Sequence, residues 1–95
     1  MKDFGALMKQ AQAMQEKLAA SQAEIEQLVL LGQAGDGMVK VTLKGTGQIS
    51  RIDIDDSLMV PGEADMVGDL VAAAHVDAKR QVDQRQAELM LNPVR

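Results

Sequence analysis

The chain has 95 residues and a net charge of −4, and 46% of its residues are hydrophobic. This length predicts one domain over residues 1–95, and a domain this small buries only about 60–65% of the surface that its unfolded chain exposes. The absence of cysteine excludes disulfides and thiolate metal sites. The sequence shows neither a membrane-length apolar run nor the apolar core of a signal peptide, so we expect a cytoplasmic protein with no membrane partner.

The first predicted element is a long helix over about residues 3–28. Small and apolar side chains recur along it with the 3,4,3,4 spacing of a heptad seam. They are Phe4, Leu7, Ala11, Met14, Leu18, Ser21, Ile25 and Leu28. Because the seam is narrow, we favour contact with another helix. The alternative is a plain amphipathic helix that lies on a sheet, which needs a wider apolar stripe.

The middle of the chain is predicted to form a three-stranded antiparallel sheet over about residues 29–55. Val39, Val41 and Leu43 alternate with polar residues, which is the pattern of a half-buried strand. Glycines at positions 35, 37, 45 and 47 predict the turns between strands. The expected strands are residues 29–35, 38–44 and 48–55.

A second long helix is predicted over about residues 63–90, after a turn at Pro61 and Gly62. The order is therefore α-β-β-β-α, an α+β fold. A helix of about 25 residues is about 38 Å long, whereas a strand of five or six residues spans about 17–20 Å. Both helices should then protrude beyond the sheet and leave apolar stripes in water. Pairing of two copies would cover these stripes, so we expect a homodimer.

The side chains expected at the dimer interface come from the stripes of both helices. They are Leu7, Ala11, Met14, Leu18, Leu70, Ala74, Ala78 and Val82. The alanines among them are small enough to let another backbone approach closely.

The basic residues gather near the two ends of the chain. Residues 53–77 carry seven acids and no base, whereas residues 78–95 carry four bases and two acids. Such bases can neutralise phosphates and release counterions. The candidate DNA-contacting residues are Lys2, Lys9, Lys79, Arg80, Arg85 and Arg95. The alternative is that they are ordinary solvated bases, paired with acids such as Asp83 and Glu16. Arg85 interrupts the second stripe, where it either reaches a partner or DNA or lies along the edge of the stripe.

The sequence contains no constellation typical of an enzyme. Asp53, Asp55, Asp56 and Ser57 offer oxygen ligands to a divalent cation, but the glycine and distal glutamate of an EF-hand loop are missing, so turn capping is favoured. His75 is the only histidine and has neither further zinc ligands nor a catalytic partner. The glycines match neither a P-loop nor a dinucleotide motif. We therefore expect no catalytic residue, no metal, no cofactor and no small-molecule substrate.

Four short segments carry a family resemblance. They are Leu7-Met8-Lys9-Gln10-Ala11-Gln12 with Met14-Gln15 and Lys17, Gly35-Asp36-Gly37-Met38-Val39-Lys40-Val41, Ile52-Asp53-Ile54-Asp55 with Ser57-Leu58, and Asp69-Leu70-Val71-Ala72-Ala73-Ala74 with Asp77-Ala78. In this order they resemble the YbaB/EbfC family of nucleoid-associated DNA-binding proteins over about residues 4–80. The resemblance implies an intertwined homodimer, cytoplasmic and nucleoid-associated, that binds double-stranded DNA through its helices without catalysis.

The expected function is therefore DNA binding by a homodimer in chromosome organisation or gene regulation. The sequence lacks a helix-turn-helix, a zinc finger and an aromatic RNA-binding motif, so we expect weak sequence specificity. The acidic middle and the short tail motivate an alternative, a protein–protein interaction scaffold of the same fold with little DNA affinity.

Overall fold

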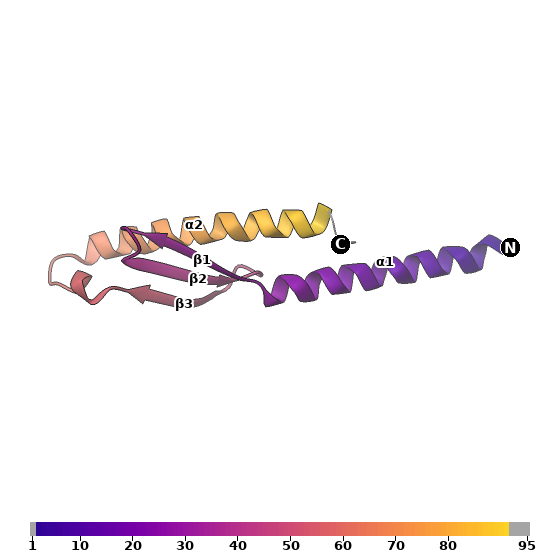
Figure 1. Ribbon diagram of the computed structural model, residues 1–95, viewed down its shortest axis with the longest axis horizontal. Coiled ribbons are helices and arrows are strands. Elements are labelled where there is room, and N and C mark those ends of the chain that lie inside the picture. Colours follow the sequence, from indigo (N-terminus) through magenta and orange to yellow (C-terminus); the bar gives the residue numbers. More distant parts are fainter. Residues whose placement is uncertain (1, 92–95) are drawn as a thin grey trace.

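The computed structural model describes the backbone of residues 2–91 and the side chains of residues 3–89. A small sheet joins two long helices (Figure 1). In chain order the elements are α1 (Lys2–Gln27), β1 (Val29–Ala34), β2 (Val39–Lys44), β3 (Ile49–Ile54), the short 3-10 helix η1 (Asp56–Leu58) and α2 (Ala64–Leu91). This arrangement confirms the predicted α-β-β-β-α fold with an antiparallel sheet.

The sheet has the order β1-β2-β3, so β2 lies in its centre. Val41 of β2 pairs with Gly32 of β1 and with Ile52 of β3. A register shift between Thr42 and Leu43 marks a bulge in the β2–β3 pair. Because successive side chains of a strand point to opposite faces, Val41 and its paired residues lie on one face and Thr42 lies on the other.

Helix α2 covers the first of these faces, above β1 and β2 (Figure 1). Its apolar stripe forms one core with the sheet. The buried core residues are Leu30, Val39, Val41, Leu43, Leu58, Ala74, Ala78 and Val82. Burial of a side chain as large as leucine stabilises a fold by about 1.5–3 kcal/mol. The expectation that one chain leaves the α2 stripe in water is therefore wrong over residues 74–82, because the chain's own sheet buries it.

Small residues set the distance between α2 and β1. A Cβ atom built on Gly32 would lie 2.2 Å from the carbonyl oxygen of Ala74 and 2.3 Å from the amide nitrogen of Ala78. The helix also covers the outer edge of β1, because Asp77 Oδ2 accepts a hydrogen bond from the Gln33 amide at 3.0 Å and Gln81 Nε2 donates to the Leu31 carbonyl at 2.9 Å. These contacts provide hydrogen-bond partners for an amide and a carbonyl group of the edge strand, which could otherwise pair with a strand of another molecule.

A second close approach, at Gly45, determines where α1 leaves the sheet. The amide of Gly45 donates to the Leu28 carbonyl at 2.9 Å, and its carbonyl accepts from Gln86 Nε2 of α2 at 2.6 Å. A Cβ atom here would lie 1.8 Å from the carbonyl oxygen of Ile25, so only glycine fits. The end of α1, the β2–β3 turn and α2 therefore meet at one residue.

From this junction α1 runs away from the sheet (Figure 1). The molecule measures 74 × 18 × 17 Å, and its radius of gyration is 19.8 Å. A compact domain of this length would have a radius of gyration of about 12 Å. The chain alone is thus a rod, and most of α1 has no neighbour within it.

The close approach at Gly32 generates a stability prediction. We expect Gly32→Ala to lower the free energy of unfolding by about 2–3 kcal/mol, because the added methyl group meets backbone atoms and α2 must shift away from β1. Chemical denaturation at neutral pH measures this loss.

Gly68→Ala is the matched control, because an added Cβ there meets no atom within 4 Å. Since alanine favours a helix over glycine by about 1 kcal/mol, this variant should be more stable than the wild type. Equal effects of the two substitutions would contradict the proposed packing.

Candidate nucleic-acid interface

Three of the candidate bases are exposed residues of α2, and each pairs with an acid of the same helix. Lys79 Nζ lies 2.6 Å from Asp83 Oδ1, Arg80 Nη1 lies 3.5 Å from Asp77 Oδ1, and Arg85 Nε lies 3.5 Å from Glu88 Oε1. Exposed pairs of this kind contribute about 0–1 kcal/mol, so a phosphate can compete for the base. Their acids nevertheless leave this surface close to neutral.

The other candidate bases are not gathered with those of α2. Lys9 is exposed on the amino-terminal half of α1, which projects beyond the carboxyl-terminal end of α2 (Figure 1). Lys2 belongs to α1, but its side chain lies outside the described residues, as does the whole of Arg95. Among the described residues, Lys9 therefore lies apart from the bases of α2.

The apolar seam of α1 is open to solvent. Phe4 is 66% exposed, and Leu7 and Met14 are each 62% exposed. Ser21 is buried, because the last turns of α1 lie beside α2. A row of large apolar side chains that extends over several helical turns is typical of a contact surface.

A second apolar strip lies on β3. Ile49 and Ile52 are 47% and 42% exposed, although their register places them on the face of the sheet that α2 covers. Helix α2 packs on β1 and β2 and does not reach β3 closely enough to bury these side chains. Both uncovered strips offer surface to a partner.

The opposite face of the sheet carries three bases that the sequence analysis did not select. Lys40 and Lys44 point to this face from β2, and Arg51 lies there on β3 because it pairs with Thr42. Arg51 Nε lies 2.7 Å from Asp53 Oδ1. The alternation of polar and apolar residues along β2 was the available signal for the two lysines, whereas the position of Arg51 depends on strand register.

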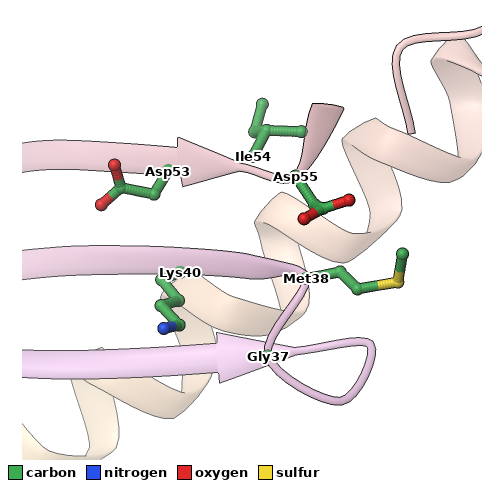
Figure 2. A pocket seen from close by; sticks show the side chains of 6 residues that line it. All are labelled: Gly37, Met38, Lys40, Asp53, Ile54 and Asp55. Carbon is green, nitrogen blue, oxygen red and sulfur yellow. The ribbon is translucent and has the colours of Figure 1, made fainter. Parts of the chain in front are cut away.

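A shallow hollow of about 190 Å³ lies at the end of this face (Figure 2). Lys40, Asp53 and Asp55 contribute its charged groups. Asp55 accepts hydrogen bonds from the Ser57 amide at 3.0 Å and from the Ser57 hydroxyl, and these bonds lower the pKa of its carboxyl group. This confirms the capping role predicted for Asp55, at the start of η1. Within residues 2–91 no cluster of three potential metal ligands is found.

An apolar hollow of about 410 Å³ lies between Leu58 and Val67, where η1 leads into α2. Its lining contains no ionisable side chain, so it lacks the groups needed for acid–base or nucleophilic chemistry.

None of the helices in residues 2–91 combines the length and apolarity required to cross a bilayer.

Comparison with known proteins assigns the family. The profile of the YbaB/EbfC DNA-binding family matches residues 1–93. The chain belongs to the YbaB/EbfC DNA-binding family. This assignment confirms the family predicted from the four sequence segments and supports a DNA-binding, non-enzymatic protein.

Similar proteins in other bacteria match almost the whole of the chain. The chain is 58% identical over 90 residues to a nucleoid-associated protein of Phenylobacterium zucineum, and the match covers 95% of this chain and 84% of that protein. A nucleoid-associated protein of a Caulobacter species is 53% identical, with 95% and 83% coverage. The crystal structure of an uncharacterized protein from Helicobacter pylori matches with a TM-score of 0.77 and 26% identity, over 95% of both chains.

The cap at Asp55 generates a prediction of pH dependence. Because the folded pKa of this carboxyl lies below its ordinary value, its stabilising effect is complete above the unfolded pKa of about 3.9 and is lost as pH falls through the folded pKa. We expect Asp55→Ala to melt at a lower temperature than the wild type at pH 7 and the difference to shrink as the pH falls below about 4.

Thermal melts between neutral pH and pH 2–3 test this dependence. Asp56→Ala is the control, since the structure records no side-chain hydrogen bond for this neighbouring carboxylate among the described residues. A difference at Asp55 that is constant over the whole pH range would show that ionisation of the cap does not matter.

Proposed function

We propose that the protein is a homodimer that binds double-stranded DNA with weak sequence specificity and contributes to chromosome organisation or gene regulation. The observation that supports this proposal most directly is the family match over residues 1–93. Its relatives in Phenylobacterium and Caulobacter are named nucleoid-associated proteins. In this proposal residues 1–95 act as one domain, and the protein is found on the nucleoid in the cytoplasm.

The exposed seam of α1 supports the homodimer. Leu7, Ala11, Met14 and Leu18 are exposed in the single chain and share one helical face, as a coiled-coil partner requires. We propose that a second copy covers them. Leu70, Ala74, Ala78 and Val82 were expected at the same interface, but they pack on the chain's own sheet. Their part in the dimer is then to hold α2 in place rather than to touch the partner.

Phosphate contacts by exposed bases supply the proposed affinity. We assign this role to the bases near the two chain ends: Lys2, Lys9, Lys79, Arg80, Arg85 and Arg95. A two-fold axis would present each of them twice to one duplex. Contacts of this kind do not read bases, so binding should tolerate many sequences and depend strongly on salt.

The ion pairs of α2 favour one competing function. Since Lys79, Arg80 and Arg85 each have an acidic partner and the chain carries a net charge of −4, the same fold could act as a protein–protein scaffold with little DNA affinity. A specific protein partner that is recovered after nuclease treatment would support this function.

A gel-shift titration tests DNA binding directly. We expect the purified protein to shift duplexes of unrelated sequence at about 50 mM salt, with affinity falling about 10³-fold or more by 200 mM if some six phosphates are neutralised. A protein that shifts no duplex at tens of micromolar under these conditions does not have the proposed function.

The dimer is tested by a pair of equivalent substitutions on α1. Met14 belongs to the seam, whereas Met8 is 56% exposed and lies outside it. We expect Met14→Gln to raise the dimer dissociation constant at least tenfold, since each buried apolar side chain contributes about 1.5–3 kcal/mol and the dimer contains two copies.

Sedimentation equilibrium at micromolar concentrations measures this change. Met8→Gln, the matched control, should leave the dissociation constant within about threefold of the wild-type value. A wild-type protein that sediments as a folded single chain at these concentrations would exclude the proposed dimer.

A further inference from the structure

We propose that the face of the sheet turned away from α2 is a phosphate-binding surface for duplex DNA, with Lys40 and Lys44 as its principal contacts and Arg51 beside them. We call it the basic sheet face. The inference rests on the proposed DNA binding and gives that function a site distinct from the bases near the chain ends.

The geometry of the strands gathers these bases on one surface. Lys40, Thr42 and Lys44 occupy alternate positions of β2, so their side chains share a face. Arg51 pairs with Thr42, which places the arginine between the two lysines on the neighbouring strand. Four residues of strand separate the Cα atoms of Lys40 and Lys44 by about 13 Å. The bases thus form a triangle on a rigid sheet and not on a flexible tail.

Among the described residues, the longest stretch of sequence without an acid contains all three of these bases. Residues 39–51 contain three bases and no acid. Helix α1 contains three bases and four acids, and α2 contains three bases and five acids. Asp53 pairs with Arg51 on the same face, so the two lysines supply its unpaired positive charge. Since nonspecific DNA affinity follows the number of phosphates neutralised, this concentration of bases favours phosphate contact.

The two lysines are also available to a ligand. Both are exposed, and among residues 2–91 the structure records no ion pair for either of them. The candidate bases of α2, in contrast, each have a carboxylate partner within 4 Å. A phosphate therefore displaces water alone at Lys40 and Lys44, whereas at α2 it must also displace an acid.

Acids lie at one end of the basic sheet face and so predict how the duplex is oriented on it. Asp53 lies opposite Lys40, and Asp55 lines the same hollow (Figure 2). Lys44 and Arg51 lie further along the strands, towards Gly45 and the end of α1. Because carboxylates repel phosphates, the duplex should contact the Lys44 end most closely. The hydroxyl group of Thr42 lies between the bases as a further donor to a phosphate oxygen.

The test compares duplex binding by the full-length wild type and by Lys40→Gln/Lys44→Gln over a salt series. We expect the double variant to raise the dissociation constant about tenfold at ~100 mM salt and to reduce the slope of log affinity against log salt by about one for each lysine. Lys40→Arg/Lys44→Arg, which keeps both charges, should bind within about threefold of the wild type.

Lys17→Glu is the control for net charge, because it changes the charge by the same two units on α1. Its dissociation constant should rise less than about threefold, and an effect equal to that of the double variant would overturn the inference. If the wild type binds and the double variant binds within threefold of it, the basic sheet face is not the site although the proposed function stands. If the wild type itself fails to bind, the proposed function fails.

Sedimentation and circular dichroism of the double variant complete the test. Both lysines are exposed, and glutamine keeps most of their length, so the fold and the dimer should be unchanged. A loss of affinity that coincides with dissociation of the dimer would assign this face to a contact between copies and would overturn the inference.

Discussion

The close packing of α2 on β1 is the constraint on which the rest of the structure depends. Gly32 lets the helix backbone approach the strand at Ala74 and Ala78 to distances that no side chain would permit. At that distance the apolar side chains of α2 pack on β1 and β2, and hydrogen bonds from Gln33 to Asp77 and from Gln81 to Leu31 hold the helix against β1. One helix cannot also cover a third strand, the other side of the sheet and the exposed length of α1. The position of α2 thus determines which surfaces remain for partners.

Local chemistry made most of the fold predictable from the sequence. Apolar residues recur at every second position from Val39 to Leu43 and at heptad spacing along α1, and this spacing distinguishes a strand from a helix. What covers an apolar stripe was not predictable in the same way, because periodicity shows which side of a helix is apolar and not what lies against it. The α2 stripe was therefore assigned to a partner, although Ala78 and Val82 pack on the chain's own sheet.

Among the candidate DNA-contacting bases, too, some arrangements could be predicted from the sequence and others could not. The ion pairs of α2 follow spacings of three and four residues, from Asp77 to Arg80 and from Lys79 to Asp83, and these could be anticipated from the sequence. The basic sheet face could not be assembled in that way. Arg51 joins Lys40 and Lys44 only through the β2–β3 register, which contains a shift between Thr42 and Leu43. A shift of one residue elsewhere would have turned Arg51 to the other face.

The spatial separation of charge reconciles a net charge of −4 with DNA binding. Salt screens exposed charges beyond about 8–10 Å at physiological ionic strength, so a duplex responds to the charges nearest to it rather than to their sum over the chain. The acids of α2 lie on a helix that covers one face of the sheet, and the bases of β2 project from the other face. The sheet between them has a low dielectric constant and keeps the two sets of charges apart. Acids weaken the attraction where they lie beside the bases, as Asp53 does beside Lys40, so the uneven distribution of charge favours contact at the Lys44 end of the sheet.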